Sequence, residues 1–188
     1  MRLRREFQRL TDMQTLTETN YFELFGLAPR FSIDLNSLER TFRQLQSEAH
    51  PDKHASNSQS EQRIALQQST LINDGYQTLR NPTSRAQFLI NLSGKAETTQ
   101  ALSNGFLMAQ MEWREAIEEA VSSRDVIVLE ALAKRLKHKI SLQVNEIAAV
   151  LDLQADYTTA ELRVNELRFY EKLRTEIGEA LDKIINQN

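Results

Sequence analysis

Residues 48–56 read EAHPDKHAS, and the segments on either side of this stretch decide the fold. Before it, in DLNSLERTFRQLQSEAH (34–50), apolar side chains recur three or four positions apart, the spacing of one helix face. These side chains are Leu35, Leu38, Phe42, Leu45 and Ala49. Pro51 is expected to end this helix, because the residue before a proline is disfavoured in the α conformation.

A second long helix is predicted after the stretch. Ser58 and Glu61 have the spacing of a capping box, in which the two residues cap a helix start reciprocally. The predicted apolar face comprises Ala65, Gln68 or Ser69, Ile72, Tyr76 and Leu79. The two helices therefore predict an antiparallel hairpin with EAHPDKHAS at its tip.

Shorter helices are predicted to flank the hairpin. Asn20 and Glu23 resemble a capping box before YFELFGL, and Gly26 is able to end that helix. Asn81 and Pro82 form an N-cap and first-turn pair for PTSRAQFLINL, which Gly94 closes. Residues 20–92 thus predict a unit of four helices. Residues 1–19 are interpreted as a frayed helical extension, with an organelle-targeting remnant or residues upstream of the domain as alternatives.

Composition agrees with an all-α protein of ordinary solubility. Apolar residues make up 40 % and charged residues 26 % of the 188 residues, and five glycines with three prolines are too few for a loop-rich β architecture. The net charge of −3 gives no overall attraction to nucleic acid or to an anionic membrane. With no cysteine in the chain, disulfides and thiolate metal sites are excluded. No secretory signal or membrane span is apparent.

A second helical unit is predicted after a small, polar linker, SGKAETTQALS (93–103). Helices are expected over about 104–121, 124–153 and 157–186, the last with Thr158 and Glu161 at capping-box spacing. Three consecutive helices with short turns favour an antiparallel three-helix bundle over residues 104–188.

The first helix of this bundle has more apolar surface than one core stripe needs. At about 100° per residue, the natural core stripe is Phe106, Trp113, Ile117 and Ala120. Leu107, Met108 and Met111 fall roughly 90° to 170° away, beside Glu112 and Glu115. They indicate an apolar patch with an acidic border.

The last helix shows the same excess of apolar surface. Its broad apolar face comprises Leu167, Tyr170, Ile177, Leu181 and Ile184. Phe169 lies about 90° from the centre of that face, with Arg168 beside it. Two readings stay open for Phe169 and the apolar patch: anchors of an interface, or packing under the linker or against the first unit.

The first unit resembles a J domain, the module that J-type co-chaperones use on DnaK-type chaperones. The resemblance rests on NYFELFGL, an amphipathic helix, HPD, a second helix ending INDGYQTLRNP, and SRAQFLI. It implies that His50, Pro51 and Asp52 dock on the partner chaperone and stimulate ATP hydrolysis. Arg40, Arg43 and Lys53 are candidates to meet an acidic partner surface, with a solvated helix face as the alternative. Gly75 stands where alanine is usual, which predicts a slightly looser hairpin.

From residue 20 the chain resembles the HscB family, J-type co-chaperones of bacterial iron–sulfur cluster biogenesis. The combination is YFELFGL, HPDKHAS, FLMAQMEWREAI and LRFYEKLR. The resemblance implies that the second unit binds the scaffold IscU and delivers it to the chaperone HscA. The scaffold-binding positions it implies are Leu107, Met108, Met111, Glu112, Glu115 and Phe169, with Arg168 adjacent. The missing cysteine-rich zinc module favours the bacterial, cytoplasmic form.

Two alternatives remain for the function. One is a general protein-folding co-chaperone with other cargo. The other is a small metal-dependent hydrolase using His50, Asp52 and His54, whose alternating H-x-D-x-H spacing would suit one side of an extended strand. The co-chaperone hypothesis expects no enzymatic activity, no metal and no cofactor. It also expects a monomer in which Leu107 and Phe169 allow weak self-association at high concentration.

Overall fold

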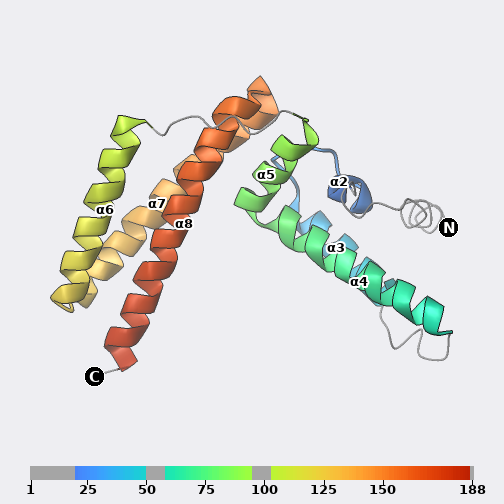
Figure 1. Ribbon diagram of the computed structural model, residues 1–188, viewed down its shortest axis with the longest axis horizontal. Coiled ribbons are helices and arrows are strands. Elements are labelled where there is room, and N and C mark those ends of the chain that lie inside the picture. Colours follow the sequence, from blue (N-terminus) through green and yellow to red (C-terminus); the bar gives the residue numbers. More distant parts are fainter. Residues whose placement is uncertain (1–19, 50–57, 95–102, 187–188) are drawn as a thin grey trace. The chain divides into compact units, whose positions relative to one another are not determined.

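The computed structural model describes residues 20–49, 58–94 and 103–186, and those ranges are helical with short connections (Figure 1). The chain divides into two compact units, Met1–Leu92 and Ser93–Asn188. The predicted all-α fold class is confirmed, with four helices in the described part of the first unit and a three-helix bundle in that of the second. No helix formed by the described residues is long and apolar enough to cross a lipid bilayer.

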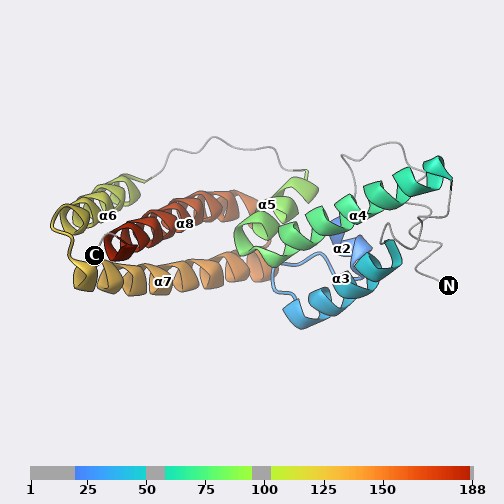
Figure 2. The same cartoon turned by 90° about the horizontal axis from the view of Figure 1, so that it is seen from below.

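The first unit is built on a pair of long helices. Its helices are α2 (Tyr21–Leu24), α3 (Leu35–Ala49), α4 (Gln59–Arg80) and α5 (Pro82–Leu92). In Figures 1 and 2, α3 and α4 run side by side, and both α2 and α5 contact α4. The predicted antiparallel hairpin is therefore present in the described residues.

The predicted caps explain where α4 and α5 begin. The Ser58 backbone N–H donates to Glu61 Oε2 at 2.9 Å, and the Glu61 backbone N–H donates to Ser58 Oγ at 3.4 Å, which completes the capping box. Asn81 Oδ1 accepts from the Ser84 backbone N–H at 2.9 Å, as an N-cap does. At α2, Asn20 Oδ1 accepts from the Phe22 backbone N–H at 3.1 Å, and not from the Glu23 backbone N–H as in a capping box.

The apolar stripes of α3 and α4 form the core of the first unit. Leu38, Leu45, Ile72 and Leu79 are at most 3 % exposed. The Phe42 and Tyr76 rings stack with centroids 4.0 Å apart. Leu35, expected on the α3 stripe, is the first residue of the helix and is 49 % exposed.

The second unit is an antiparallel bundle of three long helices (Figure 2). They are α6 (Asn104–Ser122), α7 (Val126–Ala149) and α8 (Tyr157–Asn186), with a short π-helix, η2 (Val150–Gln154), after α7. The predicted α6 core stripe is buried: Phe106, Trp113, Ile117 and Ala120 are at most 6 % exposed. They pack with buried leucines and isoleucines of α7 and α8 in one cluster.

One predicted helix start and one predicted cap in this unit differ from the structure, while α8 begins at Tyr157 as expected. The helix expected from 124 begins at Val126, because Arg124 has φ 52° and Asp125 Oδ1 accepts from the Val128 backbone N–H. The cap of α8 is Asp156 and not Thr158, because Asp156 Oδ1 accepts from the Thr159 backbone N–H at 3.1 Å. The α-helical part of α7 ends at Ala149, but the helical backbone continues as η2 to Gln154, close to the predicted end, and Ala155 with φ 52° then ends it.

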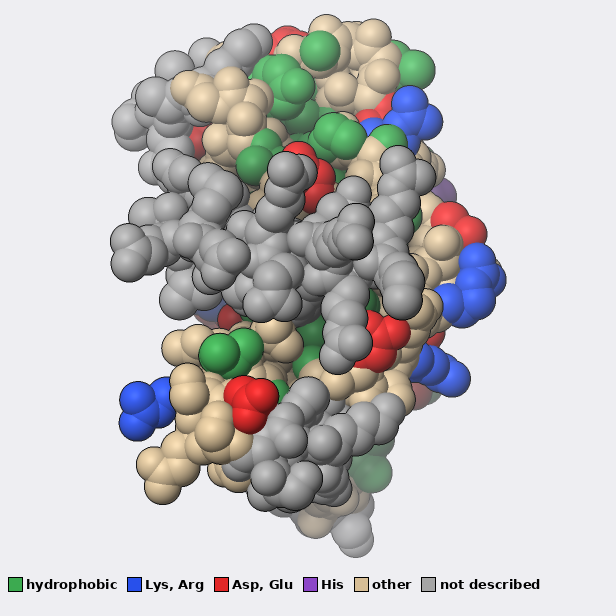
Figure 3. Space-filling model, turned by 90° about the vertical axis from the view of Figure 1, so that its right-hand side faces the viewer, with side chains coloured by type: hydrophobic (Ala, Val, Ile, Leu, Met, Phe, Trp, Pro, Cys, Tyr) green, Lys and Arg blue, Asp and Glu red, His purple; other side chains and the backbone are tan. Residues whose placement is uncertain are grey.

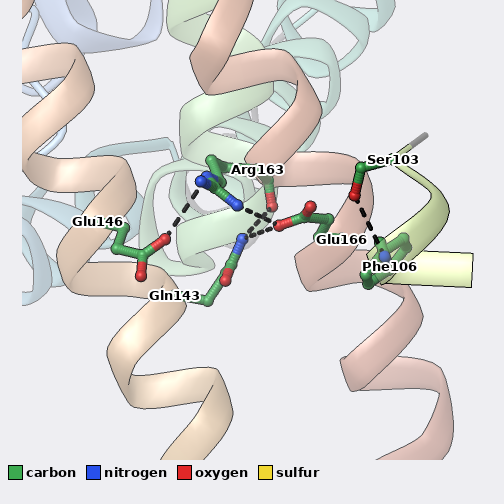
Figure 4. A network of polar contacts seen from close by, with 6 residues as sticks. All are labelled: Ser103, Phe106, Gln143, Glu146, Arg163 and Glu166. Atoms are coloured by element: carbon green, nitrogen blue, oxygen red, sulfur yellow. Dashed lines mark hydrogen bonds and ion pairs between the residues drawn. The ribbon is translucent and has the colours of Figure 1, made fainter. Parts of the chain in front are cut away.

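A polar network fastens α7 to α8 (Figure 4). Gln143, 1 % exposed, donates through Nε2 to Glu166 Oε2 at 2.7 Å and to the Arg163 carbonyl oxygen at 3.3 Å. Arg163 Nη1 donates to the same carboxylate at 2.9 Å and its Nε lies 3.5 Å from Glu146 Oε2. Because the buried amide has partners on the facing helix, the network fixes the register of the two helices.

Gly75 has a packing role that the sequence reading missed. It is buried in α4, and a Cβ atom there would lie 2.9 Å from Tyr21 Cδ1 and 3.0 Å from Phe25 Cε2. Tyr21 is itself stacked on Phe88, with ring centroids 4.8 Å apart. Gly75 thus lets the rings of Tyr21 and Phe25 pack closely on α4, and the expectation of a slightly looser hairpin stays a prediction.

A valine at position 75 is expected to destabilise the first unit. Gly75→Val adds a branched side chain where Tyr21 and Phe25 already fill the space, so the free energy of unfolding should fall by about 2 kcal/mol. Gly178→Val is the matched control, because a Cβ at Gly178 meets nothing within 4 Å. Thermal unfolding followed by circular dichroism measures both. Equal melting temperatures for the two variants would contradict the packing role.

Candidate functional site

The first candidate site is the segment between α3 and α4. His50, Pro51, Asp52 and Lys53, together with His54, lie outside the described residues. The described structure ends the first helix of the hairpin at Ala49 and starts the second at Gln59. Of the predicted residues of this site, the structure therefore describes only those on the polar face of α3, which precedes the segment.

Arg40 and Arg43 lie on that face and each has an acidic neighbour. Arg43 holds Glu39 with two donors, Nη2 at 2.7 Å and Nε at 3.2 Å from Oε1. Arg40 Nη2 lies 3.9 Å from Asp34 Oδ2, and both side chains are largely exposed. Because exposed ion pairs contribute little, the weakly paired Arg40 is more available to an acidic partner than Arg43.

Glu39 links the charged face of α3 to the core of the hairpin. Its Oε2 accepts from the Tyr76 hydroxyl at 3.1 Å, and the Tyr76 ring stacks on Phe42. The hydrogen bond from Arg43, followed by that from Tyr76, lowers the pKa of Glu39 below its usual value. Glu39 therefore favours its charged form and holds Arg43 in place.

Figure 3 shows one face of the molecule, on which the described Lys and Arg side chains stand apart from one another. Acidic or uncharged side chains lie between them. The described Lys and Arg side chains that can be seen on this face are therefore separate from one another.

The second candidate site is the outer face of α6. We call Leu107, Met108 and Met111 the α6 patch; they are 44 %, 64 % and 63 % exposed. Glu112 and Glu115 border it and are also exposed. Ser103 Oγ accepts from the Phe106 backbone N–H at 3.2 Å and starts the helix just before the patch (Figure 4). Three exposed large side chains on consecutive turns fit a surface that another protein covers.

Phe169 is only half-buried and belongs to an aromatic cluster. Its ring packs edge-on against Phe106 and Tyr170, with each pair of centroids 5.6 Å apart. Phe106 and Tyr170 make a similar contact at 5.9 Å. Phe169 thus joins α8 to α6 through contacts within the second unit and remains partly exposed. Its use as an interface anchor stays a prediction.

Burial also affects the hydroxyl end of this cluster. The pKa of Tyr170 is raised first by burial and then by the nearby Glu166 carboxylate. Tyr170 is 3 % exposed, and the Lys139 ammonium lies 5.7 Å from its ring centroid. The phenol therefore stays neutral and acts as part of the core beneath Phe169.

Arg114 completes this region and was missed in the sequence reading. Its guanidinium carbon lies 5.8 Å from the Phe169 ring centroid, and its Nη1 lies 3.8 Å from Glu176 Oε2 on α8. Arg168, predicted beside Phe169, is exposed and its Nη1 donates to Asn165 Oδ1 at 3.2 Å. A helical wheel centred on the core would have indicated Arg114, because it lies between the core stripe and Leu107.

Known proteins resemble the chain over both units. Residues 102–178 match a family model described as the HSCB C-terminal oligomerisation domain. A co-chaperone protein HscB homolog from Azoarcus sp. (strain BH72) is 42 % identical over 172 residues, which cover 90 % of this chain and 97 % of the relative. One from Paraburkholderia xenovorans (strain LB400) is 37 % identical over 170 residues, or 89 % and 97 % of the two chains.

Two solved structures have the same fold. The chaperone HscB from Vibrio cholerae is 34 % identical with a TM-score of 0.80, over 88 % of this chain and 99 % of that one. The human co-chaperone protein HscB is 26 % identical, also with a TM-score of 0.80, over 87 % and 83 % of the two chains.

The packing of Phe169 predicts unequal costs of truncation in the second unit. Phe169→Ala removes two ring contacts and the partner of Arg114, so the free energy of unfolding should fall by about 2 kcal/mol. Leu107→Ala truncates a side chain that is 44 % exposed and should cost less than about 1 kcal/mol. Urea unfolding measures both, and equal losses would show that the ring is not held by Phe106.

Proposed function

The chain belongs to the HscB family of co-chaperones, and from this premise we propose that it delivers the iron–sulfur scaffold IscU to the DnaK-type chaperone HscA. Co-chaperones of this family are not enzymes, so the proposed role is binding and delivery. The observation that carries the proposal is the α6 patch, a row of exposed apolar side chains on a helix whose opposite face is buried. In this role residues 20–92 act as the J domain and residues 104–188 as the scaffold-binding domain.

The chaperone-binding role is assigned to the segment between α3 and α4. His50, Pro51 and Asp52 match the HPD motif of J domains, and Lys53 follows them. Support comes from the flanking residues: α3 and α4 form the hairpin that this motif joins, and Arg40 is exposed with only a distant acidic neighbour. In this proposal Arg40 and Arg43 meet an acidic surface of HscA, and Arg43 exchanges Glu39 for the partner's carboxylate.

Scaffold binding is assigned to the α6 patch and its surroundings. Met108 and Met111 supply adaptable apolar contact, and Phe169 supplies a ring held on one side by Phe106. Glu112, Glu115 and Arg168 provide a charged rim, which favours one orientation of the partner on this surface. The family model that matches this unit is described as an oligomerisation domain, which supports placing protein assembly here.

Two binding sites on one chain give the proposed mechanism. While the second unit holds IscU, the first engages HscA, so the scaffold is present at high effective concentration when the ATPase is stimulated. ATP hydrolysis then traps the scaffold on HscA and favours cluster transfer to acceptor proteins. The two relatives compared by sequence are bacterial, and we propose that the protein acts in the bacterial cytoplasm.

The hydrolase alternative has no support in the family assignment, because the relatives are co-chaperones. Its three residues, His50, Asp52 and His54, lie outside the described residues. Within the described ranges, no group of three or more His, Asp or Glu side chains is placed to hold a metal ion. Delivery of a scaffold remains the proposed function.

Steady-state ATPase measurements on HscA test the two sites separately. We expect the wild-type chain and IscU together to stimulate the ATPase activity of HscA by more than the sum of their separate effects. His50→Gln should abolish stimulation with or without IscU. Leu107→Ala/Met111→Ala should retain stimulation by the chain alone but lose at least about tenfold in apparent affinity for IscU, since two exposed anchors are truncated.

Ile127→Ala/Leu153→Ala is the matched control, because these side chains are 80 % and 84 % exposed outside the α6 patch. It should behave as wild type. If IscU adds nothing to wild-type stimulation, the cargo assignment is wrong while the J-domain assignment stands. If HscA is not stimulated at all, the delivery mechanism is wrong.

A further inference from the structure

A groove runs along α4 on the face opposite the stripe that packs on α3. It is lined by Tyr21 of α2 and by one face of α4, and its volume of about 310 Å³ is at the small end of the range of binding sites. The described residues leave large apolar side chains uncovered here, since Leu66 is 59 % exposed and Ile64 is 45 % exposed. We call this feature the α4 groove; its lining residues on α4 are Leu66, Gln67, Thr70, Leu71 and Asp74.

The Tyr21 wall of the α4 groove is held in place from two sides. Its ring stacks on Phe88 with centroids 4.8 Å apart, and a Cβ atom at Gly75 would lie 2.9 Å from Tyr21 Cδ1. Burial, followed by the carboxylate of Asp74, raises the pKa of Tyr21, so the hydroxyl stays neutral. Asp74 is exposed and has no ion pair with a described residue. The groove thus offers apolar surface, a fixed ring and a carboxylate for which the described residues supply no cation.

Residues 1–19, which lie outside the described residues, have a complementary composition. Leu3, Phe7 and Leu10 recur at steps of four and three residues, the spacing of one helix face. Residues 1–10 also contain four arginines and one glutamate, which gives them a formal charge of +3 at pH 7. This segment can therefore supply both the apolar side chains and the cation that the α4 groove lacks.

The segment is also tethered to the groove, because Thr19 is separated from Tyr21 by a single residue. The groove extends over about 12 Å of α4, the helical rise from Leu66 to Asp74. Residues 11–19 span about 30 Å when extended, so residues 1–10 can reach every part of it. Such a short tether gives an effective concentration in the millimolar range. It favours this segment over a second copy or a separate peptide present at micromolar concentration.

We propose that residues 1–10 dock in the α4 groove of the same chain. Phe7 and Leu10 cover the exposed apolar side chains of the groove, and an arginine of the segment pairs with Asp74. Because the docked segment contacts both α2 and α4, it holds the two helices together and buries apolar surface of the first unit. No residue of α3 lines the groove, so Arg40 and Arg43 stay accessible while the segment is docked. The contact is therefore independent of the chaperone and scaffold assignments.

Disulfide trapping tests this contact in the full chain, which has no cysteine of its own. Gln8→Cys places one thiol beside Phe7 without replacing an apolar side chain of the segment. Gln67→Cys places the second thiol in the groove, and Gln44→Cys, at an exposed position on α3, is the matched control. In a mild oxidant at about 5 µM chain, positions 8 and 67 should form an intramolecular disulfide at least about tenfold faster than positions 8 and 44. Mass spectrometry of a proteolytic digest identifies the bond.

Further variants separate docking from chance encounters of the two thiols. With the thiols at positions 8 and 67, Phe7→Ala/Leu10→Ala should slow trapping to the rate of the control pair, because the apolar contact is lost. Asp74→Arg should slow it about threefold, since an ion pair becomes a repulsion between exposed charges. Gln14→Ala, which lies outside residues 1–10, should leave the rate unchanged. Circular dichroism checks that every variant is folded.

Equal trapping rates for the two pairs of positions would overturn the proposal, as would a rate that Phe7→Ala/Leu10→Ala does not change. A disulfide that joins two chains at this concentration would also overturn it, and would assign the α4 groove to a second copy. Neither HscA nor IscU is present in this experiment, so its failure would leave the proposed function untouched.

Discussion

The edge-to-face packing of Phe106 on Phe169 and Tyr170 is the interaction on which the proposed cargo surface depends. It fixes the start of α6 against α8, so the next residues along α6 must point outward. A helix has room for one buried stripe here, and Phe106, Trp113, Ile117 and Ala120 occupy it. The α6 patch is exposed for that reason.

A comparable constraint organises the first unit. Phe42 and Tyr76 stack between α3 and α4, and the Tyr76 hydroxyl reaches the carboxylate of Glu39. This carboxylate then holds Arg43, so a cation on the side of α3 proposed to meet the partner is positioned from the core outward. In both units an aromatic contact in the interior sets the orientation of a proposed recognition residue on the surface.

Much of this arrangement was predictable from sequence because it depends on local rules. The Ser58–Glu61 capping box and the α6 core stripe follow from spacing alone, and both are present. The packing role of Gly75 could not be predicted because helix propensity describes an isolated helix, whereas the rings of Tyr21 and Phe25 that approach it come from another part of the chain. Arg114 was missed because its partners, Phe169 and Glu176, are distant in sequence. Asp156 and not Thr158 caps α8 because the helix begins at Tyr157, so the residue that precedes it occupies the cap position, and capping-box spacing alone did not distinguish the two.

The four methionines of the chain offer the most direct test of the central claim, that the α6 patch binds the scaffold. They are Met1 and Met13 near the N-terminus, and Met108 and Met111 on the patch. With the methionine methyl groups labelled by ¹³C, titration with IscU should shift or broaden the signals of Met108 and Met111 and leave those of Met1 and Met13 unchanged. If IscU binds, as measured by calorimetry, while the two patch signals do not move, the scaffold uses another surface and the account is wrong.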